Sequence, residues 1–292
     1  MASLERDVGA ILFERTPRGV SLTESGQALL RHAELALGQL ARAQAELSAI
    51  AELRGGRLRV GSFTSATTVF VASAVEVFRE RYPAVELEFA DGEPFQSLAR
   101  LTTADLDLAV IFDLDNWEAG LSYEGVSMAS ADGLQVVPLF DDPFHLVCSR
   151  AHRLASRRAV ALEQLAGECI LAGPPWARDL AELSCSAKLD LEIDTSFRAT
   201  GFEAFQAFVA AGRGVTLIPK LALGWKQERL AAVPVRGNPL RRHVKIAMAA
   251  HSRATQTMLA LIREQIRKSV TPGPPGQSTV SRDGQARLRV VA

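Results

Sequence analysis

The chain has 292 residues, of which 48% are hydrophobic, and this is more than one ordinary core accommodates, so we expect about two domains with connecting segments. Its 33 Lys and Arg residues equal its 33 Asp and Glu residues, which excludes an overall basic nucleic-acid coat and confines any DNA contact to a local surface. No stretch reaches the roughly 20 apolar residues of a membrane-spanning helix, and the charged Glu5, Arg6 and Asp7 precede any apolar stretch, so neither a membrane protein nor an exported one is expected.

Residues 23–53 are typical of one long helix, because the segment lacks proline and is rich in strong helix formers. Thr23 can cap its start. Apolar residues then recur with alternating gaps of three and four residues, which is the spacing of a coiled-coil seam. The seam consists of Leu30, Ala33, Leu37, Leu40, Gln44 and Leu47. A helix packed on its own domain would show a similar stripe, but the sequence nearby offers no helix to pack against, so we predict dimerisation.

The pattern changes after Gly55 and Gly56 to alternating short strands and helices. The expected elements are a strand at 58–60, a helix at 66–81 ended by Pro83, a strand at 85–89, a short helix at 94–101 and a strand at 106–112. The last of these is apolar enough to be buried on both faces. This βαβαβ order is typical of a doubly wound α/β lobe.

A second set of the same kind follows. It consists of strands at 169–172, 193–198 and 215–218 and helices at 177–189 and 202–211. Strands at 134–140 and 144–148 lie between the two sets, and a strand at 244–249 and a helix at 254–267 come last. We expect the chain to cross from the first lobe to the second near Cys148 and to return near Val244, which makes a two-stranded hinge. The segment from Thr271 is rich in proline, glycine and polar residues and is expected to be disordered.

Three stretches resemble the LysR-type transcriptional regulators. FERTPRGVSLT at 13–23 is similar to the wing of that family's winged helix-turn-helix where it leads into the linker helix. GRLRVG at 56–61, FRERYP at 78–83 and DLDLAV at 105–110 resemble the family's first regulatory lobe, and VAAGRGVTLIP at 209–219 resembles the second. Together the likeness covers about residues 4 to 268.

The resemblance implies an α/β fold in which a long linker helix precedes two Rossmann-like lobes of a periplasmic-binding-protein-type effector domain. It also implies a homodimer or homotetramer that binds DNA under the control of a small-molecule effector. The expected segments are a winged helix-turn-helix remnant at 1–22, the linker and dimerisation helix at 23–54, lobe I at 55–148, lobe II at 149–240, a return to lobe I at 241–268 and a disordered tail at 269–292.

The start of the chain departs from the family pattern. A helix-turn-helix reads bases with its second helix in the major groove, and residues 3–6 would already be the far end of that helix. We therefore expect the base-reading residues to be missing and an upstream start codon to exist; a truncated regulator without autonomous DNA binding is the alternative. The wing remains, and Arg15, Thr16 and Arg18 are its expected DNA contacts. A second departure is Ala104, where the family often has glycine, and it alters only a turn.

Hydroxyl side chains cluster where the first strand ends and its helix begins, a place where free N–H groups and hydroxyls can hold a ligand carboxylate. Capping the helix requires only one of them, so Ser62, Thr64 and Ser65 are expected to contact the effector. By the same strand-end argument the further candidates are Phe112, Asp113, Gly173, Arg198 and Thr200. Arg198 would pair with an anionic effector, although the position fits a surface residue equally well.

No pattern in the sequence predicts catalysis, a cofactor or a metal site. The five histidines lack HExxH spacing and the three cysteines, Cys148, Cys169 and Cys185, lack CxxC spacing. The GRG sequence at 212–214 follows a helix, the reverse of the order in a phosphate-binding loop. An enzyme is therefore not expected, and the cysteine usage suits a reducing cytoplasm. A solute-binding protein of transport shares the two-lobe fold, but it needs an export signal and has no use for a wing.

Overall fold

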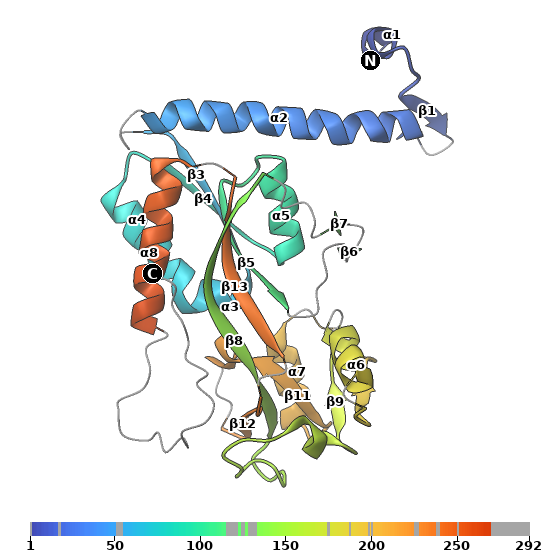
Figure 1. Cartoon of the computed structure of the whole chain (residues 1–292), viewed down its shortest axis with the longest axis vertical. Coiled ribbons are helices and arrows are strands. Elements are labelled where there is room, and N and C mark those ends of the chain that lie inside the picture. Colours follow the sequence, from blue (N-terminus) through green and yellow to red (C-terminus); the bar gives the residue numbers. More distant parts are fainter. Residues whose placement is uncertain are drawn as a thin grey trace.

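The structure, a computed structural model, describes residues 2–16, 19–50, 55–114, 122–123, 126–127, 133–173, 176–186, 188–197, 199, 201–224, 228–237, 240–249 and 251–269. A helix and a hairpin precede one long helix, and an α/β body of two lobes follows (Figure 1). The expected α/β fold, with a long helix ahead of two lobes, is confirmed. In the described part of the chain, no helix combines the length and apolar character needed to cross a membrane.

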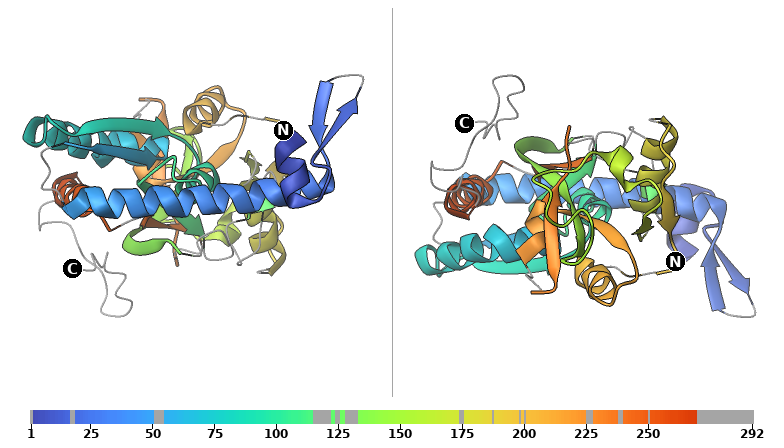
Figure 2. Two further views of the ribbon diagram at one scale, coloured as in Figure 1. Left: turned by 90° about the horizontal axis from the view of Figure 1, so that it is seen from above. Right: turned by 90° about the horizontal axis from the view of Figure 1, so that it is seen from below.

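The amino-terminal segment is joined to the long helix by hydrogen bonds. Its elements are α1 (Ala2–Val8), β1 (Phe13–Thr16), β2 (Gly19–Leu22) and α2 (Glu24–Ile50). β1 and β2 pair antiparallel. Thr23 caps α2 as expected, because its Oγ1 accepts the N–H of Gly26 at 3.0 Å. The same hydroxyl donates to the carbonyl of Ile11 at 2.7 Å, so the hairpin is fixed to the start of α2 (Figure 2).

Lobe I begins with three parallel strands in the order β4-β3-β5. Its first elements are β3 (Arg57–Ser62), α3 (Thr64–Ala66), α4 (Ala72–Arg81), β4 (Glu86–Asp91), α5 (Pro94–Thr102) and β5 (Leu108–Leu114). A π-helical turn at Thr67–Val71 joins α3 to α4, so the helix expected at 66–81 is continuous but contains one widened turn. The fully buried Leu58 and Phe78 belong to the core between the sheet and these helices.

Two antiparallel strands connect the lobes, β8 (Gln135–Ser149) and β13 (Arg241–Met248). β8 pairs with β13 up to Pro143 and with a strand of lobe II from Phe144 onwards. The two strands expected at 134–140 and 144–148 are therefore one continuous strand. The reason is that Asp141 and Asp142, which resemble turn residues, instead pair across the sheet with His243 and Arg242 of β13.

Lobe II has three parallel strands in the order β10-β9-β11, flanked by antiparallel β8. Its elements are β9 (Cys169–Leu171), α6 (Trp176–Ser186), β10 (Glu192–Asp194), α7 (Phe202–Ala210), β11 (Val215–Pro219) and β12 (Leu230–Pro234), with 3₁₀ turns at Leu162–Leu165 and Lys220–Gly224. β12 pairs with β8. β10 ends before the predicted strand of 193–198 does, because this edge strand pairs with β9 over only three residues.

β8 makes one continuous ladder of the two lobes, and each lobe has its own main hydrophobic cluster, although Leu221 of lobe II packs into that of lobe I and Leu114 of β5 into that of lobe II. The strand order is β10-β9-β11-β8-β13-β5-β3-β4, with β12 also on β8. Val60 and Ile262 lie in the lobe I core, whereas Leu146 and Val215 lie in that of lobe II. The last helix, α8 (Arg253–Ser269), packs on α4 of lobe I. A small hairpin consists of β6 (Ser122–Tyr123) and β7 (Val126–Ser127). The residues from 270 onwards, where a disordered tail is expected, lie outside the described residues.

Candidate functional site

The hydroxyls at the carboxyl end of β3 lie in different environments. Ser62 is fully buried and its Oγ donates to the carbonyl of Phe63 at 3.3 Å, so it belongs to the core. Thr64 is exposed, and Ser65 is half-buried with its Oγ accepting a hydrogen bond from Arg242 Nη2 at 3.0 Å. The structure therefore leaves Thr64 and Ser65 accessible to a solute and Ser62 inaccessible.

A buried ion pair lies at the same strand end. Arg242 of β13 is 1% exposed and Asp142 of β8 is 2% exposed. The guanidinium Nη2 and Nε donate to Asp142 Oδ2 at 2.6 and 3.0 Å, and Asp142 Oδ1 accepts the backbone N–H of Leu221 at 3.0 Å. Because Leu221 belongs to a 3₁₀ turn of lobe II and Ser65 to lobe I, the ion pair is bonded to both lobes.

Two aromatic rings enclose the guanidinium of this pair. Phe63 and Phe112 meet edge to face with their centroids 4.9 Å apart. The Arg242 Cζ lies 4.9 Å from the first ring centroid and 4.7 Å from the second. A desolvated guanidinium over a ring gains up to about 2 kcal/mol. Phe112, predicted as an effector contact, therefore packs against Arg242.

Carboxylates border Thr64. Asp91, at the end of β4, accepts a hydrogen bond from the Thr64 hydroxyl at 3.1 Å. Glu93 follows at the N-cap position of α5. Burial raises the pKa of Glu93, while the positive charge of Arg242 lowers it and the negative charge of Asp91 raises it further. Because Asp142 already pairs with Arg242, Asp91 and Glu93 remain as acidic side chains at this end of the sheet in the described part of the chain.

Asp113 lies on the other face of β5. Side chains alternate along a strand, so Asp113 points away from Phe112, and it forms an ion pair with Lys245 of β13. Its Oδ1 is buried and has no hydrogen-bond partner among the residues that the structure describes. The structure therefore separates Asp113 from the group around Thr64 and Ser65.

Gly173 lines a small cavity in lobe II. The cavity, of about 20 Å³, has apolar walls that include Phe144, Phe205 and Leu240. This volume holds a molecule the size of water rather than an organic effector. A Cβ on Gly173 would lie 2.9 Å from the ring of Phe205, so this position requires glycine for packing. The two remaining candidates of lobe II, Arg198 and Thr200, lie outside the described residues.

The predicted seam of α2 is exposed wherever its side chains are described. Leu30, Leu37 and Leu40 are 45, 65 and 64% exposed, and Ala33 is half-buried. The side chains of Gln44 and Leu47 lie outside the described residues. An exposed row of leucines is the surface that a second helix would cover, so dimerisation through this seam stays a prediction.

The segment predicted to be the wing forms the β1–β2 hairpin, but the side chains of its predicted DNA contacts are not described. Arg15 and Thr16 lie in β1 with side chains outside the described residues, and Arg18 lies outside them entirely. Their role in DNA binding therefore stays a prediction.

Within the described part of the chain, no group of three or more His, Cys, Asp or Glu side chains is placed to hold a metal ion. All three cysteines are free thiols, with Cys148 buried, Cys169 half-buried and Cys185 exposed. Burial, followed by the negative charge of Glu168, raises the pKa of Cys148. Its thiolate, the nucleophilic form, is thereby disfavoured.

Sequence reasoning missed Asp142, Arg242 and Asp91. The first two are 100 residues apart and become partners only through the antiparallel pairing of β8 with β13. The charge of Asp142 within the largely apolar β8 indicates that a partner of opposite charge is needed if it is buried, but it does not indicate which residue supplies that partner. Asp91 would have been found by applying the strand-end argument to β4 as well as to β3 and β5.

Comparison with known proteins gives one family. The profile described as the LysR substrate binding domain matches residues 51–267. A hydrogen peroxide-inducible genes activator of Pectobacterium carotovorum subsp. carotovorum is 30% identical over 228 residues, which cover 77% of this chain and 70% of that protein.

Two solved structures share the fold. A full-length OxyR variant from Pseudomonas aeruginosa has a TM-score of 0.63 at 20% identity and covers 91% of this chain and 83% of its own. The BenM effector binding domain with its effector benzoate has a TM-score of 0.60 at 16% identity, with 75% of this chain and 96% of that one covered.

Proposed function

The chain belongs to the LysR family of transcriptional regulators, and we propose that a small organic effector controls it by binding beside Thr64 and Ser65, at the carboxyl ends of β3 and β4. Regulators of this family bind DNA and small-molecule effectors and usually form oligomers. The homologues are regulators rather than enzymes, and the proposal contains no catalytic step.

The observation that carries the proposal is the pair of contacts made by Arg242. Its Nη2 donates to Ser65 Oγ of lobe I and to Asp142, and Asp142 in turn accepts the N–H of Leu221 in lobe II. A ligand that contacts Ser65 therefore perturbs a hydrogen-bond network that extends into both lobes, and one that contacts Thr64 binds beside it.

The proposed mechanism is a shift between two arrangements of the lobes. The effector favours the arrangement that binds it more tightly, and the difference between its two affinities limits the size of the shift. Since α2 precedes lobe I directly, a changed arrangement re-angles the linker helices within the oligomer. The wing residues Arg15, Thr16 and Arg18 would then meet the DNA at an altered spacing.

The charges around Thr64 refine the class of effector. An organic anion was expected from Arg198, which lies outside the described residues. In the described part of the site, Asp91 and Glu93 are acidic and Arg242 is already paired with Asp142. We therefore propose that the effector presents a hydroxyl, amide or ammonium donor to Asp91, and that any carboxylate it carries faces lobe II.

A thermal-shift screen tests this site. Organic acids are compared with hydroxy- and amino-substituted acids of the same carbon skeleton, and the substituted compounds are expected to raise the Tm. A ligand at about 100 times its Kd adds roughly 2.7 kcal/mol to the stability. Thr64→Val removes the hydroxyl and should abolish the shift.

The matched control is Thr257→Val on α8, whose hydroxyl donates to a backbone carbonyl at 2.7 Å far along the chain from the site. This variant should bind the effector like the unmodified protein. Equal shifts in the Thr64 and Thr257 variants would refute the proposed site.

Two relatives are named for induction by hydrogen peroxide, and peroxide reacts with cysteine as the thiolate. Burial raises the pKa of Cys148 and disfavours that form. We therefore do not assign a sensing role to Cys148.

A further inference from the structure

α5 extends from the proposed effector site to the linker helix. Its first residue, Pro94, follows Glu93, which lies within the field of Arg242 and Asp91. Its last residue, Thr102, contacts α2, which crosses above α5 in Figure 1. The nine residues of α5 span about 13 Å. The apolar face of the helix is buried on lobe I, so a displacement at one end is transmitted to the other.

The contact between α2 and α5 depends on a glycine. Gly38 is buried, and a Cβ built there would lie 2.5 Å from the carbonyl oxygen of Thr102, closer than real Cβ atoms approach an oxygen. The close approach allows a weak Cα–H···O contact between the two helices. Glycine in a helix interior costs about 1 kcal/mol relative to alanine, and this contact gives a structural reason for it.

The carbonyl of Thr102 belongs to a well-held turn. The N–H of Asp105 donates to Arg100 O at 2.7 Å and the N–H of Ala104 donates to Leu101 O at 3.3 Å. These are the two hydrogen bonds of a Schellman motif. The end of α5 therefore presents a fixed surface to α2.

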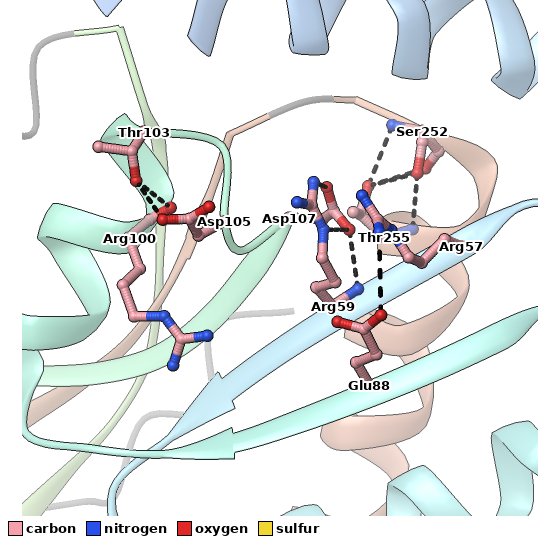
Figure 3. A network of polar contacts seen from close by, with 9 residues as sticks. All are labelled: Arg57, Arg59, Glu88, Arg100, Thr103, Asp105, Asp107, Ser252 and Thr255. Atoms are coloured by element: carbon pink, nitrogen blue, oxygen red, sulfur yellow. Dashed lines mark hydrogen bonds and ion pairs between the residues drawn. The ribbon is translucent and has the colours of Figure 1, made fainter. Parts of the chain in front are cut away.

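Polar contacts fix the strands behind this turn, as Figure 3 shows below α2. Arg59 of β3 and Asp107, just before β5, form an ion pair of 2.8 Å, and Asp107 also accepts the backbone N–H of Arg59 at 2.7 Å. Thr103 donates to Asp105 at 2.8 Å. The surface that α2 contacts is thus joined to the sheet of lobe I.

Gly38 does not lie on the predicted dimer seam. It follows Leu37 and is therefore turned about 100° from it around the helix. Leu37 is 65% exposed, whereas Gly38 is buried. α2 can pair with a second copy along one face while another face contacts its own lobe I.

A second glycine makes a similar contact near the wing. A Cβ on Gly26 would collide with the carbonyl oxygen of Leu12, which also accepts the N–H of Thr23 at 3.0 Å. Gly26 and Gly38 lie 12 residues apart, or about 18 Å along the helix. One rigid helix therefore contacts the wing segment at one glycine and the effector lobe at the other.

We propose that Gly38 is a positioning residue that sets the angle of the linker helix on lobe I, and that α5 transmits displacements from the effector site to this contact. The transmission rests on the proposed function, whereas the docking at Gly38 does not.

Hydrogen–deuterium exchange of the full-length protein tests the docking. Gly38→Ala places a methyl group against the Thr102 carbonyl and is expected to speed exchange of residues 35–41 and 103–106 roughly tenfold. The amides of β9 report on global folding and should not change. Gly55→Ala is the control, because a Cβ at that position meets nothing within 4 Å.

Helix propensity alone predicts the opposite result, since alanine at an ordinary position strengthens a helix. Slower or unchanged exchange at 35–41 in Gly38→Ala would overturn the docking. If the β9 amides also exchange faster in Gly38→Ala, the variant is globally destabilised, and exchange is compared within the unmodified protein instead. There, residues 36–40 should exchange more slowly than residues 29–32, and the reverse order overturns the proposal.

The transmission through α5 is tested from its other end. Glu93→Ala removes the N-cap side chain and is expected to speed exchange at 103–106 as well as at 95–97. A response confined to 95–97 overturns the transmission and leaves the docking intact. Thr64→Val tests the effector site by thermal shift and should not alter exchange around Gly38. Failure of the proposed effector site and failure of the docking at Gly38 are therefore distinguishable.

Discussion

Ala104 and Lys188 have left-handed backbone conformations, with φ of +58° and +54°. Each is the residue after a helix end at which two backbone hydrogen bonds close a Schellman motif. Glycine adopts this conformation without strain, whereas a Cβ costs roughly 1–2 kcal/mol. A glycine at position 104 would therefore adopt the observed backbone conformation without this strain.

Ala104→Gly is expected to stabilise the protein by roughly 0.5–1 kcal/mol, because relief of the strain exceeds the extra freedom that glycine gives the unfolded chain. Urea unfolding followed by circular dichroism measures the change. Ala99→Gly, the same substitution inside α5, should instead destabilise by about 1 kcal/mol. Equal effects of the two substitutions would show that the conformation at 104 is not strained.

Residues next to a strand end could be predicted from the sequence, and residues brought together by long-range pairing could not. Thr64 and Ser65 follow directly from the end of β3, since local order alone places them there. Arg242 reaches Ser65 across 177 residues. The pairing register of β13 determines that contact, and a single sequence does not state the register.

At the scale of elements, helix ends were more predictable than strand ends. Pro83 and Gly212 ended their helices close to the expected positions, because both residues act through local backbone geometry. The sequence predicts two strands in place of β8, and Asp141, Asp142 and Pro143 lie between them, although the structure continues the strand through these residues. The strand continues because Asp142 has a buried partner in the neighbouring strand, which local sequence does not reveal.

The pairing of β8 with β13 predicts that replacing Asp142 lowers the free energy of unfolding strongly, whereas replacing its neighbour Asp141 lowers it little. Asp142→Ala leaves the buried Arg242 without a counter-charge and should destabilise by about 3–5 kcal/mol. Asp141→Ala, next to it, removes exposed ion pairs with Arg241 and His243 and should cost no more than about 1 kcal/mol. Urea midpoints of the purified variants measure both effects.

The double variant Asp142→Leu with Arg242→Met completes this test. Replacing both charges with apolar side chains removes the unpaired ion, so the double variant should be more stable than Asp142→Ala alone. A double variant that is less stable than the single one would show that the ion pair itself, and not the stranded charge, supplies the stability.

The described part of the molecule combines one continuous sheet with hydrophobic clusters in each of its two lobes. Two lobes could be predicted from the repeated βα pattern, because each set of strands is apolar enough for its own core. The sharing of β8 was not predictable, since it depends on which strands lie beside it on each side of Pro143. Among the described strands, β8 and β13 run between the two lobes and carry the buried ion pair, so the proposed change in lobe arrangement would strain this region.

The exposed leucines of α2 concern the assembly of two chains. Leu37 and Leu40 are 65 and 64% exposed in the single chain, and in the predicted dimer they are buried against a second α2. Replacing both with Asp would place carboxylates in an apolar seam, which costs several kcal/mol for each unpaired charge. Size-exclusion chromatography with light scattering is expected to show the mass of a single chain for this variant.

Leu35→Asp supplies the matched comparison. Leu35 is 49% exposed and therefore similarly accessible, but it lies about 160° from Leu37 around the helix. This variant should keep the mass of the assembly, because Leu35 lies outside the predicted seam. An equal loss of mass in both variants would mean that helix weakening rather than the seam controls assembly, and no loss in either would place the interface on another surface.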